Sequence, residues 1–224
     1  MKIRMLVLTC LLLGSAVQAQ DEGPEVTEDG LVRVPSSRNV GVYRLPEATF
    51  NQYQRVQIAP IKVEFKKGWE RNHREMNEKD LQKLRGQLAF TYREELIKEL
   101  VNRGGYKLTK EATPDTLRVS ASILQADITA PKASAALAER TLVRTAGSMK
   151  LVVELHDAAS GVLIARLIDY AQPPEYREPR LATEISNLAD FRVEFESSAR
   201  YTHEALAVAR SAKREEQSQI KTGN

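Results

Sequence analysis

The sequence is poor in the residue types that most often carry out chemistry at a protein site. Its 224 residues include one Cys, three His and one Trp. A lone cysteine excludes an intrachain disulfide, and a structural zinc site needs several thiolates or histidines close together. His73, His156 and His203 are far apart, and His73-Arg74-Glu75 lacks the spacing of a His-Glu-x-x-His zinc helix. We therefore predict no metal site and no cofactor.

Patterns for nucleophilic or acid–base catalysis are also missing. Ser134, Ser148 and Ser160 are not set in a nucleophile-elbow pattern. The carboxylate pairs Glu94-Glu95 and Glu215-Glu216 lie in stretches rich in Lys and Arg, as expected for solvated helix faces. We therefore predict that the protein is not an enzyme.

The charge balance excludes a strongly basic protein. Lys and Arg number 33 against 30 Asp and Glu, a net charge of +3, whereas nucleic-acid binders carry a marked basic excess. Hydrophobic residues make up 42% of the chain, which is typical of a globular domain. We predict no nucleic-acid partner and no transmembrane segment in the mature chain.

The first nineteen residues have the order of a secretory signal peptide. Lys2 and Arg4 are followed by the apolar stretch Met5–Leu13 and by Val17-Gln18-Ala19. This stretch is too short to span a membrane, which takes about 20 residues. We predict cleavage between Ala19 and Gln20 and a periplasmic mature protein, with association with the outer membrane as an open possibility.

Cys10 raises the alternative of a lipid anchor. A lipoprotein cysteine stands at the end of the apolar segment, but here four more apolar or small residues follow Cys10. We therefore interpret Cys10 as part of the hydrophobic segment, and cleavage after Ala19 would leave no cysteine in the mature chain.

The rest of the chain divides into a leader, a domain and a tail. We predict that residues 20–52 form an acidic disordered leader and then an extended arm lying on the domain. Residues 53–212 are predicted to form a single domain, and residues 213–224 a polar tail that frays.

Within the domain, hydrophobic periodicity gives the order strand, helix, about four strands, helix. The first strand, Val56–Phe65, is bent at Pro60, and the first helix starts at Asn77 or Asp80 and ends at Gly104-Gly105. Leu117–Ile123, Met149–Leu155 and Val162–Tyr170 alternate as strands, and Leu188–Ala209 has a helical stripe. The predicted fold class is α/β (α+β), a two-layer sandwich in which two long amphipathic helices cover a mixed sheet of about five strands.

Two surface regions are candidates for contact with a partner. The first is the connection from Lys66 to Lys79, where Trp69 lies among the cations Lys66, Lys67, Arg71 and Arg74. The simpler alternative is that Trp69 packs over the sheet edge while the cations solvate the loop. The second region is the excursion from Pro131 to Gly147 with Arg140 and Arg144, which could equally fold as a short helix on the rim.

Short pieces spread over most of the chain also carry a resemblance. In order they are Tyr53, Ile58-Ala59-Pro60, Phe65, Trp69, Gly104-Gly105-Tyr106, Asp115-Thr116-Leu117-Arg118, Ala130-Pro131, Ala146-Gly147-Ser148-Met149, Glu154-Leu155-His156-Asp157, Ser160-Gly161, Ala165-Arg166, Asp169, Asn187 and Asp190. From about Gly30 to Ala207 the chain resembles an exported proteobacterial family, the domain of unknown function 3313, many of whose members are lipoproteins. The lipid-attachment cysteine is not recognisable here, and Ser197-Ser198 stands where an aromatic residue is expected. The resemblance implies no activity and no site residues.

The leading functional hypothesis is an exported, non-catalytic cell-envelope protein that binds another periplasmic or outer-membrane protein. A sheet edge could also pair with a strand of the partner. The alternative is a periplasmic carrier of a small amphiphile or glycan held between helix and sheet, and the third hypothesis is an envelope hydrolase. A large apolar pocket would favour the carrier, and a buried Ser, His or carboxylate cluster in a cleft would favour the enzyme.

Overall fold

The computed structural model describes residues 25–36, 40–129, 142–173, 175–181 and 184–222, with side chains in the same ranges except at 180–181, 184–186 and 212–222. The predicted signal peptide with Ala19 and Gln20, Cys10 and Arg140 lie outside the described residues.

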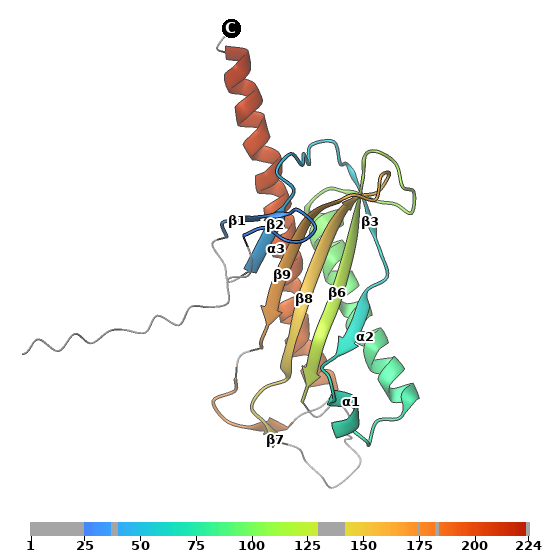
Figure 1. Ribbon diagram of the computed structural model, residues 1–224. Helices are drawn as coiled ribbons and strands as arrows, with labels where there is room; N and C mark the ends of the chain where they lie inside the picture. Colours follow the sequence, from blue (N-terminus) through green and yellow to red (C-terminus); the bar gives the residue numbers. More distant parts are fainter. Residues whose placement is uncertain (1–24, 37–39, 130–141, 174, 182–183, 223–224) are drawn as a thin grey trace, which may run out of the picture.

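One large sheet forms the first layer (Figure 1). Its strands are β1 (Val32–Val34), β2 (Val40–Arg44), β3 (Arg55–Ile58), β4 (Lys62–Phe65), β5 (Lys107–Leu108), β6 (Thr116–Ile128), β8 (Gly147–Asp157) and β9 (Leu163–Ala171). The order is β1-β2-β9-β8-β6-β3-β5, and β4 pairs with the second half of β6. β3 and β4 run parallel to β6, whereas β8 runs antiparallel to both β6 and β9. A separate ribbon joins β7 (Leu142–Val143) to β10 (Arg180–Leu181).

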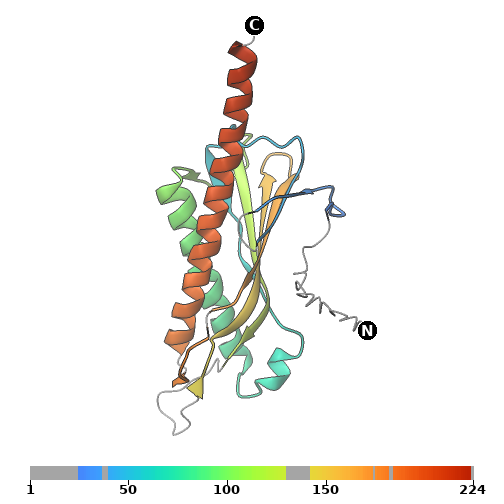
Figure 2. The ribbon, with the colours of Figure 1, turned by 90° about the vertical axis from the view of Figure 1, so that its left-hand side faces the viewer.

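The second layer consists of α2 (Glu78–Ile97), its π-helical continuation η1 (Lys98–Arg103) and α3 (Glu184–Thr222), which lie on one face of the sheet (Figure 2). A short helix, α1 (Trp69–Asn72), lies in the connection before α2. The predicted mixed α/β class is confirmed. The sheet is wider than the five strands expected, since Pro60 splits the first strand into β3 and β4 and the arm adds two more.

The N-terminal arm is extended, as predicted, but it is part of the sheet. β2 pairs antiparallel with β9, with Val42 opposite Leu167, and β1 pairs with β2. Leu31 is fully buried and Tyr43 is only 3% exposed. A backbone hydrogen bond from Arg33 N to the Glu25 carbonyl covers the outer side of β1.

Local chemistry sets the ends of α2 and η1. Asn77 is the N-cap of α2, and its side chain accepts from Asp80 N while the Asp80 carboxylate accepts from Asn77 N. At the other end, Gly105 has φ +73°, a conformation that glycine adopts without steric cost. Both predicted boundaries are confirmed.

α3 is longer than its apolar stripe. The helix continues to Thr222, through the segment where fraying was predicted, and it projects past the sheet (Figures 1 and 2). Lys, Arg, Glu and Gln dominate this segment and are good helix formers, so the backbone is helical without an apolar face.

The core lies between the two layers. In β8, and in β6 from Leu117 to Ile123, alternate residues face the helices, including Val119, Leu151 and Val153. A bulge in β6 then shifts the buried positions to Ala126 and Ile128. From the helix side come Leu88, Tyr92, Leu96, Phe191 and Phe195, all at most 1% exposed. The ring of Tyr92 stacks on Phe195 with 4.9 Å between centroids.

Candidate functional site: a cationic groove at the sheet edge

A groove with a volume of about 540 Å³ lies at the β3 edge of the sheet, on the side where β3 and α2 meet. We call it the edge groove. It is lined by Gln57, Ile58, Ala59, Pro60, Arg93, Leu108, Thr109, Lys110 and Arg118.

The edge groove exists because β3 stops at Ile58. Pro60 has no N–H to continue the ladder, and the chain returns to β6 only at Lys62. Arg93 of α2 reaches into this gap and donates from Nη1 to the Ile58 carbonyl at 2.9 Å. On the other side Gln57 Nε2 donates to the Lys110 carbonyl at 3.0 Å, which fixes the loop after β5.

The electrostatics of the edge groove are of one sign. Arg93, Lys110 and Arg118 contribute three cationic side chains, and no carboxylate lines the groove. Within the described part of the chain none of the three makes an ion pair, whereas neighbouring Arg55 lies 3.1 Å from Asp115. The rest of the lining includes an apolar part, which consists of Ile58, Ala59, Pro60 and Leu108.

Arg118 is the groove cation with a buried, unpaired donor, since its Nε has no hydrogen-bond partner among the described residues. In the strand register, Arg118 of β6 lies opposite His156 of the neighbouring strand β8. Burial, and after it the charge of Arg118, lowers the pKa of His156, so this imidazole is neutral at pH 7. Arg118 therefore faces no second positive charge from His156 at that pH.

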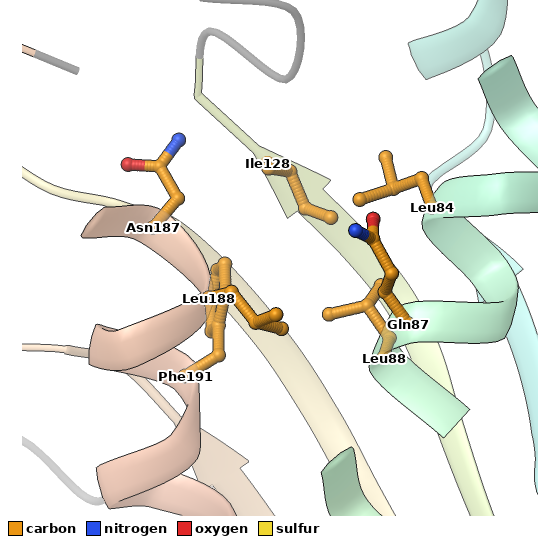
Figure 3. Close-up of a pocket in the computed structure, with 7 residues that line it drawn as sticks. All are labelled: Leu84, Gln87, Leu88, Ile128, Asn187, Leu188 and Phe191. Atoms are coloured by element: carbon orange, nitrogen blue, oxygen red, sulfur yellow. The ribbon is translucent and has the colours of Figure 1, made fainter. Parts of the chain in front are cut away.

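The space between the helices and the sheet is nearly filled. Figure 3 shows its cavity, where Leu84 and Leu88 of α2 face Leu188 and Phe191 of α3 above the end of β6. Its volume is about 10 Å³, at most enough for one water molecule. No group of three or more His, Cys, Asp or Glu that could hold a metal occurs in the part of the chain that the structure describes.

In the candidate contact region around Trp69, the ring is packed inside the protein, as the simpler alternative predicted. Trp69 is 3% exposed, so it offers no surface to a partner, and the simpler alternative is the correct one. Its ring stacks between Phe65 and His73, with centroid distances of 4.3 and 4.1 Å. Its Nε1 donates to the Ile128 carbonyl at 3.1 Å. The connection folds back as α1 because this large apolar ring finds cover at the end of β6.

The cations around Trp69 are exposed but form no patch of one sign. Lys66 Nζ lies 2.6 Å from Asp127 Oδ2. Arg71 lies against Gly68. The neighbouring Glu70 is an exposed acidic residue, and its carboxylate pairs with Arg85 at 2.5 Å. Lys67 and Arg74 are exposed.

Arg144 lies just after β7, is exposed, and donates from Nη1 to the Arg177 carbonyl at 3.4 Å. β7, which directly precedes Arg144, lies at the same end of the sheet as α1 (Figure 1).

A family model matches residues 26–201, described as a protein of unknown function (DUF3313). The chain belongs to the DUF3313 family. No curated protein matches it.

Solved structures similar to this DUF3313 chain are distant. A PelC dodecamer from Paraburkholderia phytofirmans is 8% identical with a TM-score of 0.36, over 70% of this chain and 97% of that one. A DUF330 protein from Xanthomonas campestris is 8% identical with a TM-score of 0.39, over 77% and 92%. A neuraminyllactose-binding hemagglutinin homologue from Helicobacter pylori is 15% identical with a TM-score of 0.37, over 78% and 93%. Likenesses this distant identify no function.

Sequence reasoning missed the groove residues of this DUF3313 chain. Arg93 is one of several charges on the polar side of α2, and Arg118 is one of the polar residues that alternate along β6. The one usable signal was Pro60, since a proline inside a strand pattern marks an edge or a break. Among the described helices none combines the length and the apolar character that crossing a membrane requires.

Proposed function

We propose that this DUF3313 chain is an exported, non-catalytic protein of the cell envelope that binds an acidic segment of another envelope protein in the edge groove. The observation that carries the proposal is the set of three cations, Arg93, Lys110 and Arg118, which no carboxylate of the described residues neutralises. A partner carboxylate would gain a charge-assisted hydrogen bond without first displacing an internal ion pair. Apolar side chains of the same segment would cover Leu108 and Pro60.

Three features support the remaining parts of the proposal. The lining of the groove has no pairing of a nucleophile with a base, which supports a binding role without catalysis. The order Lys2, Arg4, Met5–Leu13 and Val17-Gln18-Ala19 supports export. The free edge of β4 carries the ion pair between Lys62 and Glu64, at 2.5 Å, which disfavours strand addition there and favours the groove.

A carrier of a small anionic amphiphile is the second candidate. The apolar part of the edge groove lining favours it, although the interior between helices and sheet offers only about 10 Å³. A carried amphiphile would use the same cations with its headgroup, so the two candidates differ in the size of what is bound.

In-cell photo-crosslinking in the native host distinguishes them. A photoreactive phenylalanine analogue replaces Leu108, which is 46% exposed in the groove, or Val208, which is 67% exposed on α3. We expect a protein adduct of defined mass from position 108 and not from position 208. The adduct should disappear when Arg93, Lys110 and Arg118 are all changed to Gln. A protein adduct that survives this triple change, or none at all, contradicts the proposal, and a bound amphiphile found by mass spectrometry would establish the carrier instead.

Fractionation and intact mass of the native protein test export. A periplasmic species that begins at Gln20 agrees with cleavage after Ala19. A membrane-bound species that begins at an acylated Cys10 would overturn that cleavage site and place the partner at the membrane.

A further inference from the structure

A second cleft lies on the α3 side of the fold, where η1 ends against this helix. It has a volume of about 480 Å³, and we call it the Tyr106 cleft. It is lined by Asn51, Gly104, Tyr106, His203, Ala207, Arg210 and Ser211. Except for glycine and alanine, every lining residue can donate a hydrogen bond from its side chain, and none carries a carboxylate.

The Tyr106 hydroxyl is the first sign of a missing partner. Tyr106 is only 4% exposed, and its buried oxygen has no hydrogen-bond partner among the described residues. Buried polar atoms are nearly always paired, with protein, water or ligand. Burial raises the pKa of Tyr106, so the hydroxyl keeps its proton at neutral pH. Its oxygen is shielded from solvent, so an acceptor in the cleft reaches it only when the Tyr106 ring shifts.

Arg210 is the second sign. Its guanidinium lies over the Tyr106 ring, 4.8 Å from the centroid, and Nη2 donates to the Tyr53 carbonyl at 2.6 Å. These contacts hold the planar group in place while using one of its N–H donors. No carboxylate of the described residues pairs with Arg210, so its charge is available to a ligand.

The backbone brings the third donor, His203, into position. η1 ends at Gly104, where an added Cβ would lie 3.2 Å from His203 Cδ2 and 2.6 Å from the Leu100 carbonyl oxygen. Only a glycine allows the turn to come this close to α3. The buried carboxylate of Glu99, 1% exposed, pairs with Arg103 at 2.5 Å. It lies 4.0 Å from His203 Nδ1 and does not line the cleft.

We propose that the Tyr106 cleft binds a small ligand through an oxyanion, a phosphate or carboxylate group, held by Arg210 and His203, and that the Tyr106 ring shifts on binding so that its shielded hydroxyl also donates to the oxyanion. An oxyanion supplies acceptors to all three donors and neutralises the unpaired guanidinium. The site is separate from the edge groove, with which it shares no lining residue. The proposed anion binding therefore does not depend on the proposed binding of a protein in the edge groove.

Calorimetric titration of the purified full-length protein tests the site. Inorganic phosphate and acetate are the two probes, with chloride at equal ionic strength as the blank. We expect saturable binding of at least one probe, and the tighter of the two identifies the group that the cleft prefers. Arg210→Gln should weaken this binding at least tenfold. Arg200→Gln, which removes a half-buried Arg of the same helix outside the cleft, should leave it unchanged.

Tyr106→Phe separates ligand binding from folding. The variant loses only the unpaired hydroxyl, so we expect it to unfold at the same temperature as the wild type or higher, yet to bind the probe several-fold more weakly. No saturable binding of either probe by the wild type would overturn the proposal. If Tyr106→Phe and Arg210→Gln both bound the probe as tightly as the wild type does, the proposal would also be overturned, because the anion would then bind elsewhere.

Discussion

The hydroxyl of Tyr92 lies 2.8 Å from the hydroxyl of Ser198, in the buried seam between α2 and α3. Tyr92 is fully buried and Ser198 is 5% exposed, so each is the other's partner in a place that excludes water. Burial raises the pKa of Tyr92, and the hydroxyl remains neutral. The small side chain at position 198, where an aromatic residue was expected, leaves room for the Tyr92 hydroxyl. The large Tyr92 side chain of α2 is thus matched by the small Ser198 side chain of α3.

Ser198→Ala should destabilise the fold by about 1–3 kcal/mol, because it leaves the Tyr92 hydroxyl buried without a partner. Adding Tyr92→Phe to this variant should restore most of the loss, since both polar groups are then gone. Urea unfolding of the two single variants and the double variant measures the coupling. Additive losses in the double variant would contradict the pairing.

Trp69→Ala should cost about 3–5 kcal/mol of unfolding free energy, because a large buried ring is lost from between Phe65 and His73. Val208→Ala, at an exposed position on α3, is the control and should change stability by less than about 0.5 kcal/mol. Since Trp69 is the only tryptophan, its fluorescence reports this site alone. A wild-type emission maximum typical of a solvated indole would show that Trp69 is exposed after all.

Two glycines should respond to alanine in opposite ways. Gly86 lies in the interior of α2 with nothing within 4 Å of an added Cβ, so Gly86→Ala should stabilise by about 0.5–1 kcal/mol. Gly147 has φ +127°, and an added Cβ would lie 1.9 Å from the Asp127 carbonyl oxygen. Gly147→Ala should therefore destabilise by more than about 2 kcal/mol. Thermal unfolding of both variants checks this, and the same sign of change in the two would refute the geometry.

The stability of the protein should fall as the pH drops below about 6.5, partly because of His156. Its pKa is lowered from 6.5 by burial and then by the charge of Arg118. The unfolded chain therefore binds a proton at a higher pH than the folded chain does. The contribution is complete above 6.5 and is lost as the pH falls through the folded-state pKa.

His156→Gln should flatten the dependence of stability on pH between 7 and 5. Arg118→Gln should raise the pKa of His156 in the folded state and flatten the dependence in part. Urea unfolding at several pH values, with NMR titration of the His156 ring, measures both effects. An unchanged slope in His156→Gln would assign the pH dependence to other groups.

Hydrophobic periodicity predicted the elements that bury a face of their own. The alternation along β6 and β8 and the stripes of α2 and α3 were sufficient, and Asn77 and Gly105 fixed the ends of a helix by their own chemistry. The arm could not be predicted in this way. Val40 and Tyr43 lie in a short segment without clear periodicity, and their partner strand, β9, is far away in the sequence. The end of α3 was misjudged because a polar sequence without a stripe can still be helical.

The candidate site was harder to predict than the fold. Lys66, Lys67, Arg71 and Arg74 are adjacent in sequence, so they looked like a patch, but Asp127 comes from another strand to pair with Lys66. Arg93, Lys110 and Arg118 are far apart in sequence, and only the break at Pro60 and the packing of α2 bring them to one groove. What makes them candidates is that no carboxylate of the described residues lines the groove beside them, and this property depends on the tertiary structure.

The pairing of β2 with β9 also bears on the order of events in folding. β6, β8 and β9 follow one another as antiparallel neighbours, so they can assemble while most of the chain is still loose. β2 must wait until β9 exists, because Val40 pairs with Asp169 and the loop between them is long. The strand that joins last also tends to open first. The amides of Val40–Arg44 should therefore exchange with solvent earlier than those of β8, and the edge of this sheet opens and closes on its own timescale.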